Sequence, residues 1–281
     1  MTTWSIGDVT VTKVKEAGLQ LPMSGLIPEF TPEELESHRS WLVPDWLDDE
    51  GHGELSVHTL LVESAGTKIM VDSCLGPGDE GWQPTPGPGF LDKLTAVGFG
   101  PEDVDVVACT HMHHDHVGWH TTREGEEWIP TFPNARYVMA GEEWEFWRHG
   151  ESPLGITRIG ETITPLVDHG VVDLVDADHG LTDEVAFVPT PGHTPGHVSV
   201  RISSSGADAV ITGDMAHHPI ELAEPQWDSL ADVDHEPANE TRAEFVEEFV
   251  DSGVLVIGTH FSGPTAGYLV REPEGVRFRA G

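Results

Sequence analysis

Short apolar or alternating runs recur along the whole chain, and each run is followed by residues typical of turns. Runs of this length and composition predict β-strands. Val57–Glu63 and Thr67–Val71 are joined by a link that contains Ala65 and Gly66, which predicts a hairpin. The predicted strands are Val9–Val14, Val57–Glu63, Thr67–Val71, Val104–Cys109, Ala135–Ala140, Val171–Val175, Glu184–Pro189, Val198–Ile202, Ala209–Thr212, Val254–Ile257, Gly267–Val270 and Val276–Arg279.

Four segments between these strands have the pattern of helices. Pro32–His38 follows Thr31, a good N-cap residue, and its proline occupies the first helical position. The other predicted helices are Phe90–Val97, Glu142–Arg148 and Glu240–Val250. Helices that intervene between many strands predict an α/β protein built of packed layers.

The chain has no low-complexity linker and no internal repeat, so we expect a single domain over residues 1–281. Residues 19–56 are rich in Pro, Trp and acidic residues, and they have the character of an insertion before the predicted hairpin. Two interpretations stay open for this segment. It forms either a lobe that only packs on the surface or a lobe that covers an active site.

Composition restricts the function further. The 281 residues include 49 Asp and Glu against 14 Lys and Arg, a formal charge of −35. Such a charge repels polyphosphates, which argues against general binding to nucleic acids or anionic membranes. No apolar run is long enough to span a membrane, and the first residues lack a secretory pattern. With only Cys74 and Cys109, we expect a reduced, cytoplasmic protein.

The acidic residues are spread evenly over both halves of the chain, while lysine occurs at only four positions. One interpretation is an ordinary acidic enzyme with solvated surface charge. The interpretation we favour is adaptation to concentrated salt, where screening over a few ångströms removes the self-repulsion of the folded state.

One segment concentrates residues that bind metal ions. It follows the apolar strand Val104–Cys109 and contains His111, His113, Asp115 and His116. In an extended segment, residues two apart face the same way, so the imidazoles of His111 and His113 are expected to lie side by side. Four such side chains within six residues are costly to collect without a cation.

Four more polar residues are placed where ligands are commonly presented. His193 lies in a turn fixed by glycine and proline, and Asp214 and His260 follow apolar strands. Asp72 follows the strand Thr67–Val71, and we expect it to accept a hydrogen bond from a ligand histidine and to fix its tautomer.

The motifs HxHxDH, PGHxxGH, TGD and GTH, in this order, resemble those of the metallo-β-lactamase-fold hydrolase superfamily. The resemblance implies an αββα sandwich with two mixed sheets and a dinuclear metal centre at one edge of the sheets. Carried over by position, His111, His113 and His193 form the first metal position, and Asp115, His116 and His260 form the second. Asp214 bridges the two, and both aspartates count as catalytic. His114 and His197 match no ligand position.

Imidazole and carboxylate ligands suit two divalent ions, Zn²⁺ before Fe, Mn or Co. Two cations about 3.5–4 Å apart would give a bridging hydroxide at neutral pH and would stabilise the charge that develops on the substrate oxygen. No protein nucleophile is then required, and both cysteines are expected to be core residues.

Within the superfamily, the sequence resembles the lactonases and the methyl parathion hydrolase-like branch. Lactonases carry Tyr three residues after the bridging aspartate, where this chain has His217. We therefore expect a hydrolase of a lactone or ester. The alternatives are a phosphotriester hydrolase and a metal-binding homologue without activity.

Two further side chains are candidates for contact with the small-molecule substrate. His217 is expected either to assist the substrate or leaving group or to turn outward beside His218 and Pro219. Trp119 is the candidate for an apolar substrate pocket, although core packing is the commoner role of large aromatic residues. A homodimer is the default expectation for the assembly.

Overall fold

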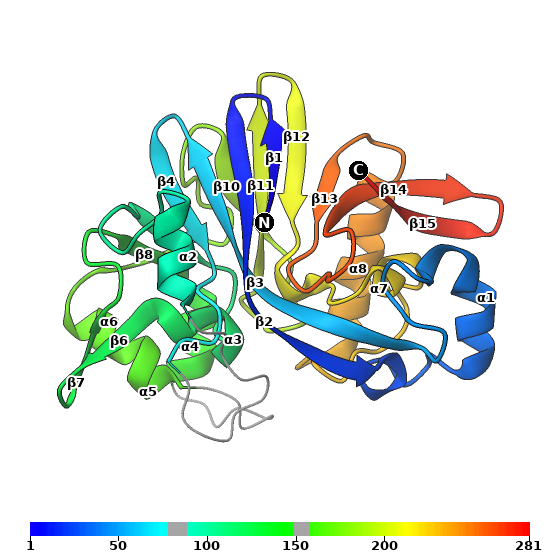
Figure 1. Ribbon diagram of the computed structural model, residues 1–281, viewed down its shortest axis with the longest axis horizontal. Helices are drawn as coiled ribbons and strands as arrows, with labels where there is room; N and C mark the ends of the chain where they lie inside the picture. The colour runs from blue at the N-terminus through cyan, green and yellow to red at the C-terminus, as the bar shows by residue number, and fades with distance from the viewer. Residues whose placement is uncertain (78–88, 149–157) are drawn as a thin grey trace.

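The predicted strands assemble into two mixed sheets that lie face to face in the computed structural model, which describes residues 1–77, 89–148 and 158–281 (Figure 1). The seven-stranded sheet has the order β1 (Thr2–Ile6), β2 (Val9–Pro22), β3 (His52–Ser64), β4 (Thr67–Val71), β5 (Val106–Cys109), β8 (Arg136–Ala140) and β9 (Val172–Val175). The six-stranded sheet has the order β10 (Val185–Pro189), β11 (Val198–Ser204), β12 (Ala207–Ile211), β13 (Leu255–Ile257), β14 (Ala266–Glu272) and β15 (Gly275–Ala280). A separate hairpin pairs β6 (Thr121–Glu124) with β7 (Glu127–Pro130).

Helices cover the outer faces of both sheets. The α-helices are α1 (Pro32–Leu42), α2 (Phe90–Ala96), α3 (His114–Val117), α4 (Gly141–Arg148), α5 (Ile159–Thr162), α6 (Thr164–Asp168), α7 (Pro219–Ala223) and α8 (His235–Phe249). The described residues also form the short 3₁₀ helices η1 (Met23–Gly25), η2 (Gly118–His120) and η3 (Gly213–Met215). No helix of the described residues is both long enough and apolar enough to cross a membrane.

Within the described parts of the chain, three hydrophobic clusters hold the layers together. The first lies between the sheets, where Val62 and Ile69 of one sheet join Val200 and Ile211 of the other. The second packs α2, α4 and α6 against the outer face of the seven-stranded sheet. The third packs α1, α7 and α8 against the six-stranded sheet. The order helix, sheet, sheet, helix confirms the predicted αββα sandwich.

The segment 19–56 is not wholly an insertion. Its two ends extend β2 and β3 into a long ribbon, in which Leu19 pairs with Leu55 and Pro22 with His52. A β-bulge between Lys15 and Ala17 shifts the register, so the alternation read from Val9 stops before the strand does. Between the ribbon ends, α1 begins at the predicted N-cap, Thr31, whose side chain accepts a hydrogen bond from the Glu34 amide.

Other boundaries differ in ways that follow from local chemistry. α8 begins at His235, five residues before the predicted start, because Pro237 is tolerated within the first turn of a helix. The sequence pattern did not predict β1, the β6–β7 hairpin or the short helices α3 and α5 to α7. These elements are too short for a periodic pattern to develop.

The sheet topology brings the candidate residues to one edge. β4 and β5 are parallel neighbours, as are β12 and β13, so the carboxyl ends of each pair lie together. Asp72 and Thr110 follow the first pair, and Thr212 and Gly258 follow the second. Segments that are far apart in sequence therefore meet where the two sheets end.

Candidate metal centre

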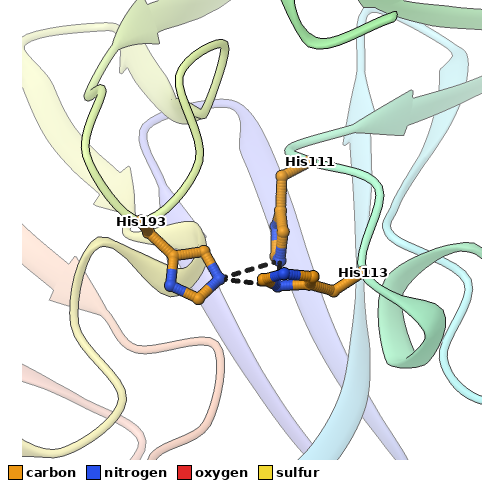
Figure 2. A group of neighbouring side chains, drawn as sticks. All are labelled: His111, His113 and His193. Atoms are coloured by element: carbon orange, nitrogen blue, oxygen red, sulfur yellow. Dashed lines mark hydrogen bonds between the residues drawn. The ribbon is translucent and has the colours of Figure 1, made fainter. Parts of the chain in front are cut away.

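Three histidine side chains converge at this edge, with their ring nitrogens facing one another (Figure 2). Nδ1 of His113 lies 2.8 Å from Nε2 of His193 and 3.0 Å from Nε2 of His111, and the last two atoms are 3.2 Å apart. His111 and His113 lie in the loop after β5, and His193 lies in the loop between β10 and β11. The structure thus assembles the predicted first metal position.

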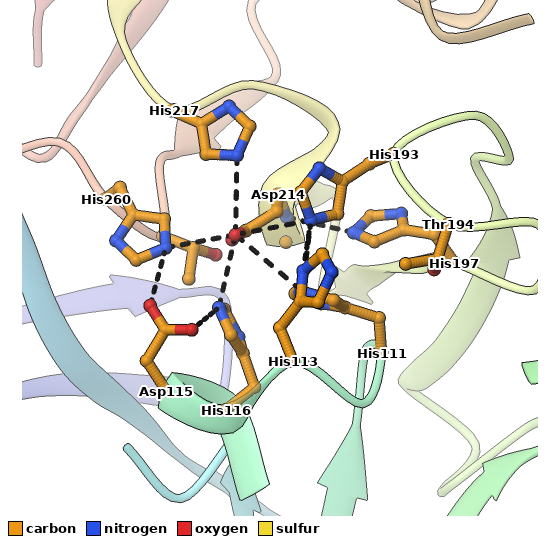
Figure 3. Close-up of polar contacts among 12 residues, drawn as sticks. His111, His113, Asp115, His116, His193, Thr194, His197, Asp214, His217 and His260 are labelled. Atoms are coloured by element: carbon orange, nitrogen blue, oxygen red, sulfur yellow. Dashed lines mark hydrogen bonds and ion pairs between the residues drawn. The ribbon is translucent and has the colours of Figure 1, made fainter. Parts of the chain in front are cut away.

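The second predicted group meets the first at one carboxylate oxygen. Oδ2 of Asp214 lies 3.0 Å from Nε2 of His260 and 3.2 Å from Nε2 of His116. The same oxygen is 3.7 Å from Nε2 of His111 and 3.6 Å from Nε2 of His193. Asp115 completes the second group, with Oδ2 at 3.7 Å from Nε2 of His260 (Figure 3). Asp214 is therefore placed between the two groups.

The protonation states of the first histidine group and of Asp214 suit metal binding. Burial lowers the pKa of His111 and His193 well below the ordinary value, and it lowers that of His113 to about 4. Burial by itself would raise the pKa of Asp214, but the surrounding histidines, led by His116, hold it well below its usual range. Neutral imidazoles and ionised carboxylates are the forms that coordinate cations.

The three facing nitrogens of His111, His113 and His193 cannot all be satisfied by hydrogen bonds to one another at the same time. The Nδ1 atoms of His111 and His193 already contact Thr110 and Asp232, which leaves their Nε2 atoms directed at the centre. Oδ1 of Asp214 has no hydrogen-bond partner among the described residues. Nitrogen and carboxylate donors at these separations fit divalent ions such as Zn²⁺, which both triads could hold with Asp214 shared.

Several of the candidate ligand histidines are fixed by a hydrogen bond at Nδ1. Oδ2 of Asp72 lies 2.9 Å from Nδ1 of His116, and the same side chain accepts hydrogen bonds from the amide and hydroxyl of Thr110. Nδ1 of His260 lies 3.0 Å from the carbonyl oxygen of Ser56. Asp72 therefore lies where the sequence analysis expected it.

Glu143, which was not singled out from the sequence, links the loop that carries His111 and His113 to the loop that carries His193. Its buried carboxylate accepts hydrogen bonds from the amide of Met112 at 2.9 Å and the hydroxyl of Thr194 at 2.7 Å. It also accepts from the Gly196 amide and the Trp147 indole. In the sequence, Glu143 has the ordinary position of an acid in the first turn of a helix, so only the tertiary structure shows its role.

His217 turns inward, so the outward orientation beside His218 and Pro219 is wrong. Its side chain is buried, Nε2 lies 3.5 Å from Oδ2 of Asp214, and Nδ1 lies 3.3 Å from Oε1 of Glu221. Burial would lower the pKa of His217, but the carboxylates of Glu221 and Asp214 raise it well above its ordinary value. His218 instead caps α7, accepting a hydrogen bond from the Ile220 amide.

His114 and His197, which lie within the motifs but match no ligand position, have different surroundings. His197 is buried, and its Nε2 accepts a hydrogen bond of 2.9 Å from the amide of Asp214. It therefore fixes the backbone that carries the central carboxylate. His114 lies at the cavity beside the candidate ligands, with Nδ1 at 3.5 Å from Oδ1 of Asp115.

A cavity of about 140 Å³ opens onto these side chains. Its polar lining includes His113, Asp115, Asp214, His217 and His260, and much of the remaining lining is apolar. The apolar lining consists of Leu19, Leu26, Leu55, Val57 and Ala231. Three of these residues belong to the segment 19–56, so this part of the chain borders the site.

Trp119 does not border that cavity, as far as the described residues define it. Its ring stacks on Phe90 with centroids 6.1 Å apart, and its indole nitrogen donates a hydrogen bond of 2.7 Å to Glu16. The prediction that Trp119 lines this pocket is wrong, because the short helix η2 directs the side chain towards α2. Cys74 and Cys109 are buried, as expected for core residues.

Comparison with known families decides how this arrangement is classified. The sequence model of the metallo-beta-lactamase superfamily matches residues 52–274. The chain belongs to this superfamily. The match covers every candidate ligand and confirms the family that the four motifs predicted.

Two relatives resemble parts of the chain. An N-acyl homoserine lactonase of Bacillus sp is 28% identical over 122 residues, which are 43% of this chain and 42% of that protein. A probable metallo-hydrolase of Mycobacterium tuberculosis is 26% identical over 186 residues, 58% of each chain. The matched regions span less than two thirds of either relative.

Solved structures show the superfamily fold over the whole chain. AidC, a dizinc quorum-quenching lactonase in complex with a product, aligns with a TM-score of 0.81 and 20% identity. The alignment covers 100% of this chain and 97% of that chain. The hydrolase AbOPH aligns with a TM-score of 0.80 and 23% identity over 98% of this chain and 95% of that chain.

Proposed function

We propose that the protein is a dinuclear metal-dependent hydrolase that acts on a lactone or an ester. The observation that carries the proposal is the position of Asp214, whose Oδ2 lies within 3.7 Å of nitrogens from both histidine groups. A structural metal site needs only one closed ligand set, whereas two adjacent sets open to a cavity are typical of catalysis. The lactonase and metallo-hydrolase relatives support the same reaction class.

Each group of residues has a defined task in this proposal. His111, His113 and His193 would hold one ion, Asp115, His116 and His260 the other, and Asp214 would contact both. Two bound zinc ions would lower the pKa of a water molecule and polarise the scissile carbonyl group. His217, which faces the cavity, is placed to donate a hydrogen bond to the substrate or to the leaving oxygen.

The cavity favours an uncharged substrate. No lysine or arginine is found among the described residues that line it, and its walls are leucine, valine and alanine side chains. A substrate whose distal part carries a carboxylate or a phosphate monoester would be repelled by the chain's net charge of −35, and no lysine or arginine among the described lining residues would bind that group. A neutral lactone or ester avoids this cost, and its apolar part would gain contact with Leu19, Leu26 and Leu55.

A neutral phosphotriester satisfies the same requirement, so the decisive experiment compares substrate classes. Zinc-loaded protein is assayed on lactones, aryl esters and phosphotriesters, with metal content measured in parallel, and the Asp214→Asn variant serves as the control. We expect the highest kcat/KM on a lactone or ester and loss of activity in the variant. A higher kcat/KM on phosphotriesters would select the alternative substrate, and zinc-loaded protein without any turnover would support a binding homologue.

A further inference from the structure

One arginine is completely buried behind the candidate metal centre. Arg242 lies on α8 and has no solvent-exposed surface. Its Nη1 donates a hydrogen bond of 2.8 Å to Oδ2 of Asp232, and its Nη2 donates one of 3.1 Å to the carbonyl oxygen of Trp227. A buried guanidinium is costly to desolvate, so its retention requires partners that offset this cost.

Asp232 connects this arginine to a candidate ligand. Its side chain is also completely buried, and Oδ1 lies 3.1 Å from Nδ1 of His193. A backbone hydrogen bond joins the same two segments, since the amide of Val233 donates to the carbonyl oxygen of His193. The loop that carries Asp232 therefore contacts both the side chain and the main chain of His193 through hydrogen bonds.

The arginine also reaches the segment that carries Asp214. Nη1 of Arg242 lies 3.4 Å from the carbonyl oxygen of Met215, the residue after Asp214. One side chain of α8 thus contacts the loop that supplies Asp214 directly and the ligand candidate His193 through Asp232. The ion pair places the positive charge of Arg242 beside the same carboxylate that contacts Nδ1 of His193.

We propose that Arg242 is a positioning residue that acts through Asp232 to fix the tautomer and orientation of His193. The ionised Asp232 accepts the Nδ1 proton of His193, which leaves the Nε2 lone pair directed at His111 and His113. The pair therefore sets the affinity of the metal position built from these three histidines. This inference rests on the proposed metal centre, although it does not depend on which substrate is hydrolysed.

The test measures zinc binding in variants of the pair. Arg242→Met leaves Asp232 buried without a counter-charge, and Asp232→Asn/Arg242→Met removes both charges while keeping an oxygen acceptor at position 232. Arg201→Met is the matched control, because Arg201 is a surface arginine that forms ion pairs with Asp208 and Glu248. Chelator competition gives the two zinc affinities, and long-range proton–nitrogen NMR correlation reports the histidine tautomers.

We expect Arg242→Met to weaken one of the two zinc ions by about 10–100-fold, with a smaller effect on the other. The double variant should regain thermal stability yet keep a lowered affinity, since a neutral amide is a weaker acceptor than a carboxylate. Arg201→Met should bind both ions normally. If Arg242→Met fails to fold, the two zinc affinities of the double variant decide the test.

Three outcomes would overturn the inference. They are normal affinity for both ions in the folded variants, equal weakening of both ions, and an unchanged Nδ1-protonated tautomer of His193. Failure of the proposed function would look different, because the unmodified protein would then not bind two zinc ions at all.

Discussion

Asp72 and His116 form a hydrogen-bonded pair, with Oδ2 of the aspartate 2.9 Å from Nδ1 of the histidine. The two residues are 44 positions apart in the sequence and follow adjacent parallel strands. Because Nδ1 is engaged, Nε2 of His116 is directed at Asp214, at 3.2 Å from its Oδ2. Asp72 thus orients a candidate ligand without reaching the metal position itself.

Asp72→Ala should lower zinc affinity or activity by about 10–100-fold, because His116 loses the group that fixes its tautomer. The measurements are zinc titration and kcat/KM. The matched control is Asp105→Ala, which removes a carboxylate at the opposite end of the same strand pair, where it accepts a hydrogen bond from the Lys68 amide. Equal effects of the two variants on zinc affinity would show that Asp72 only stabilises the strands.

Asp214→Asn should reduce zinc occupancy and activity together, because the site loses the charge that offsets two adjacent cations. We expect close to two zinc ions per chain in the unmodified protein and fewer in the variant, measured by metal analysis after dialysis. Asp208→Asn, a change at a more exposed position of β12, serves as the control. Full occupancy with normal turnover in Asp214→Asn would contradict the shared position of this carboxylate.

His217→Ala should lower kcat while both zinc ions stay bound, because His217 is placed to serve the substrate. Loss of general acid assistance typically costs about 10²–10⁴-fold. The loss should be smaller for esters of nitrophenol, whose leaving group needs no proton. Equal losses on activated and unactivated esters would exclude proton donation, and loss of zinc would make His217 a ligand.

The stability of the protein should depend on the ionisation of Glu16. Its side chain is 5% exposed and accepts hydrogen bonds from the Leu75 amide and the Trp119 indole, and burial raises its pKa to about 7. An acid with a raised pKa binds its proton more tightly in the folded state than in the unfolded state. The folded state therefore loses stability as pH rises from the unfolded pKa to the folded pKa.

Glu16→Gln cannot ionise and removes this dependence. The free energy of unfolding of the variant, relative to the unmodified protein, should increase by roughly 2–3 kcal/mol between about pH 5 and about pH 8. Urea denaturation of both proteins at matched ionic strength measures the difference, in which the titration of other groups cancels. A difference that is constant over this range would show that Glu16 keeps its ordinary pKa.

Potassium chloride should stabilise the protein. The formal charge of −35 means that acidic side chains repel one another in the folded state, and salt screens this repulsion. Screening shortens the range of this repulsion to about 3 Å near 1 M salt. Thermal unfolding is measured from low to molar salt, with sucrose as a control for effects that do not depend on charge. A midpoint that does not rise with salt would reject adaptation to concentrated salt.

Most of the fold followed from local patterns. The predicted strands correspond to strands of the two sheets, and the cap at Thr31 was read directly from neighbouring residues. The prediction failed where a tertiary contact overrides periodicity. The bulge at Glu16 hides the second half of β2 because the carboxylate turns inward to bind the loop at Leu75.

The sequence by itself determined the candidate ligands and the superfamily, because the histidine and aspartate motifs keep a fixed spacing and follow strands that end at one edge. Only the tertiary structure decided which buried charges support them. Glu143, Asp232 and Arg242 belong to helices or loops that look solvated in sequence, and their partners are distant along the chain. A hydrogen bond depends on the relative placement of whole elements, which no local pattern of residues encodes.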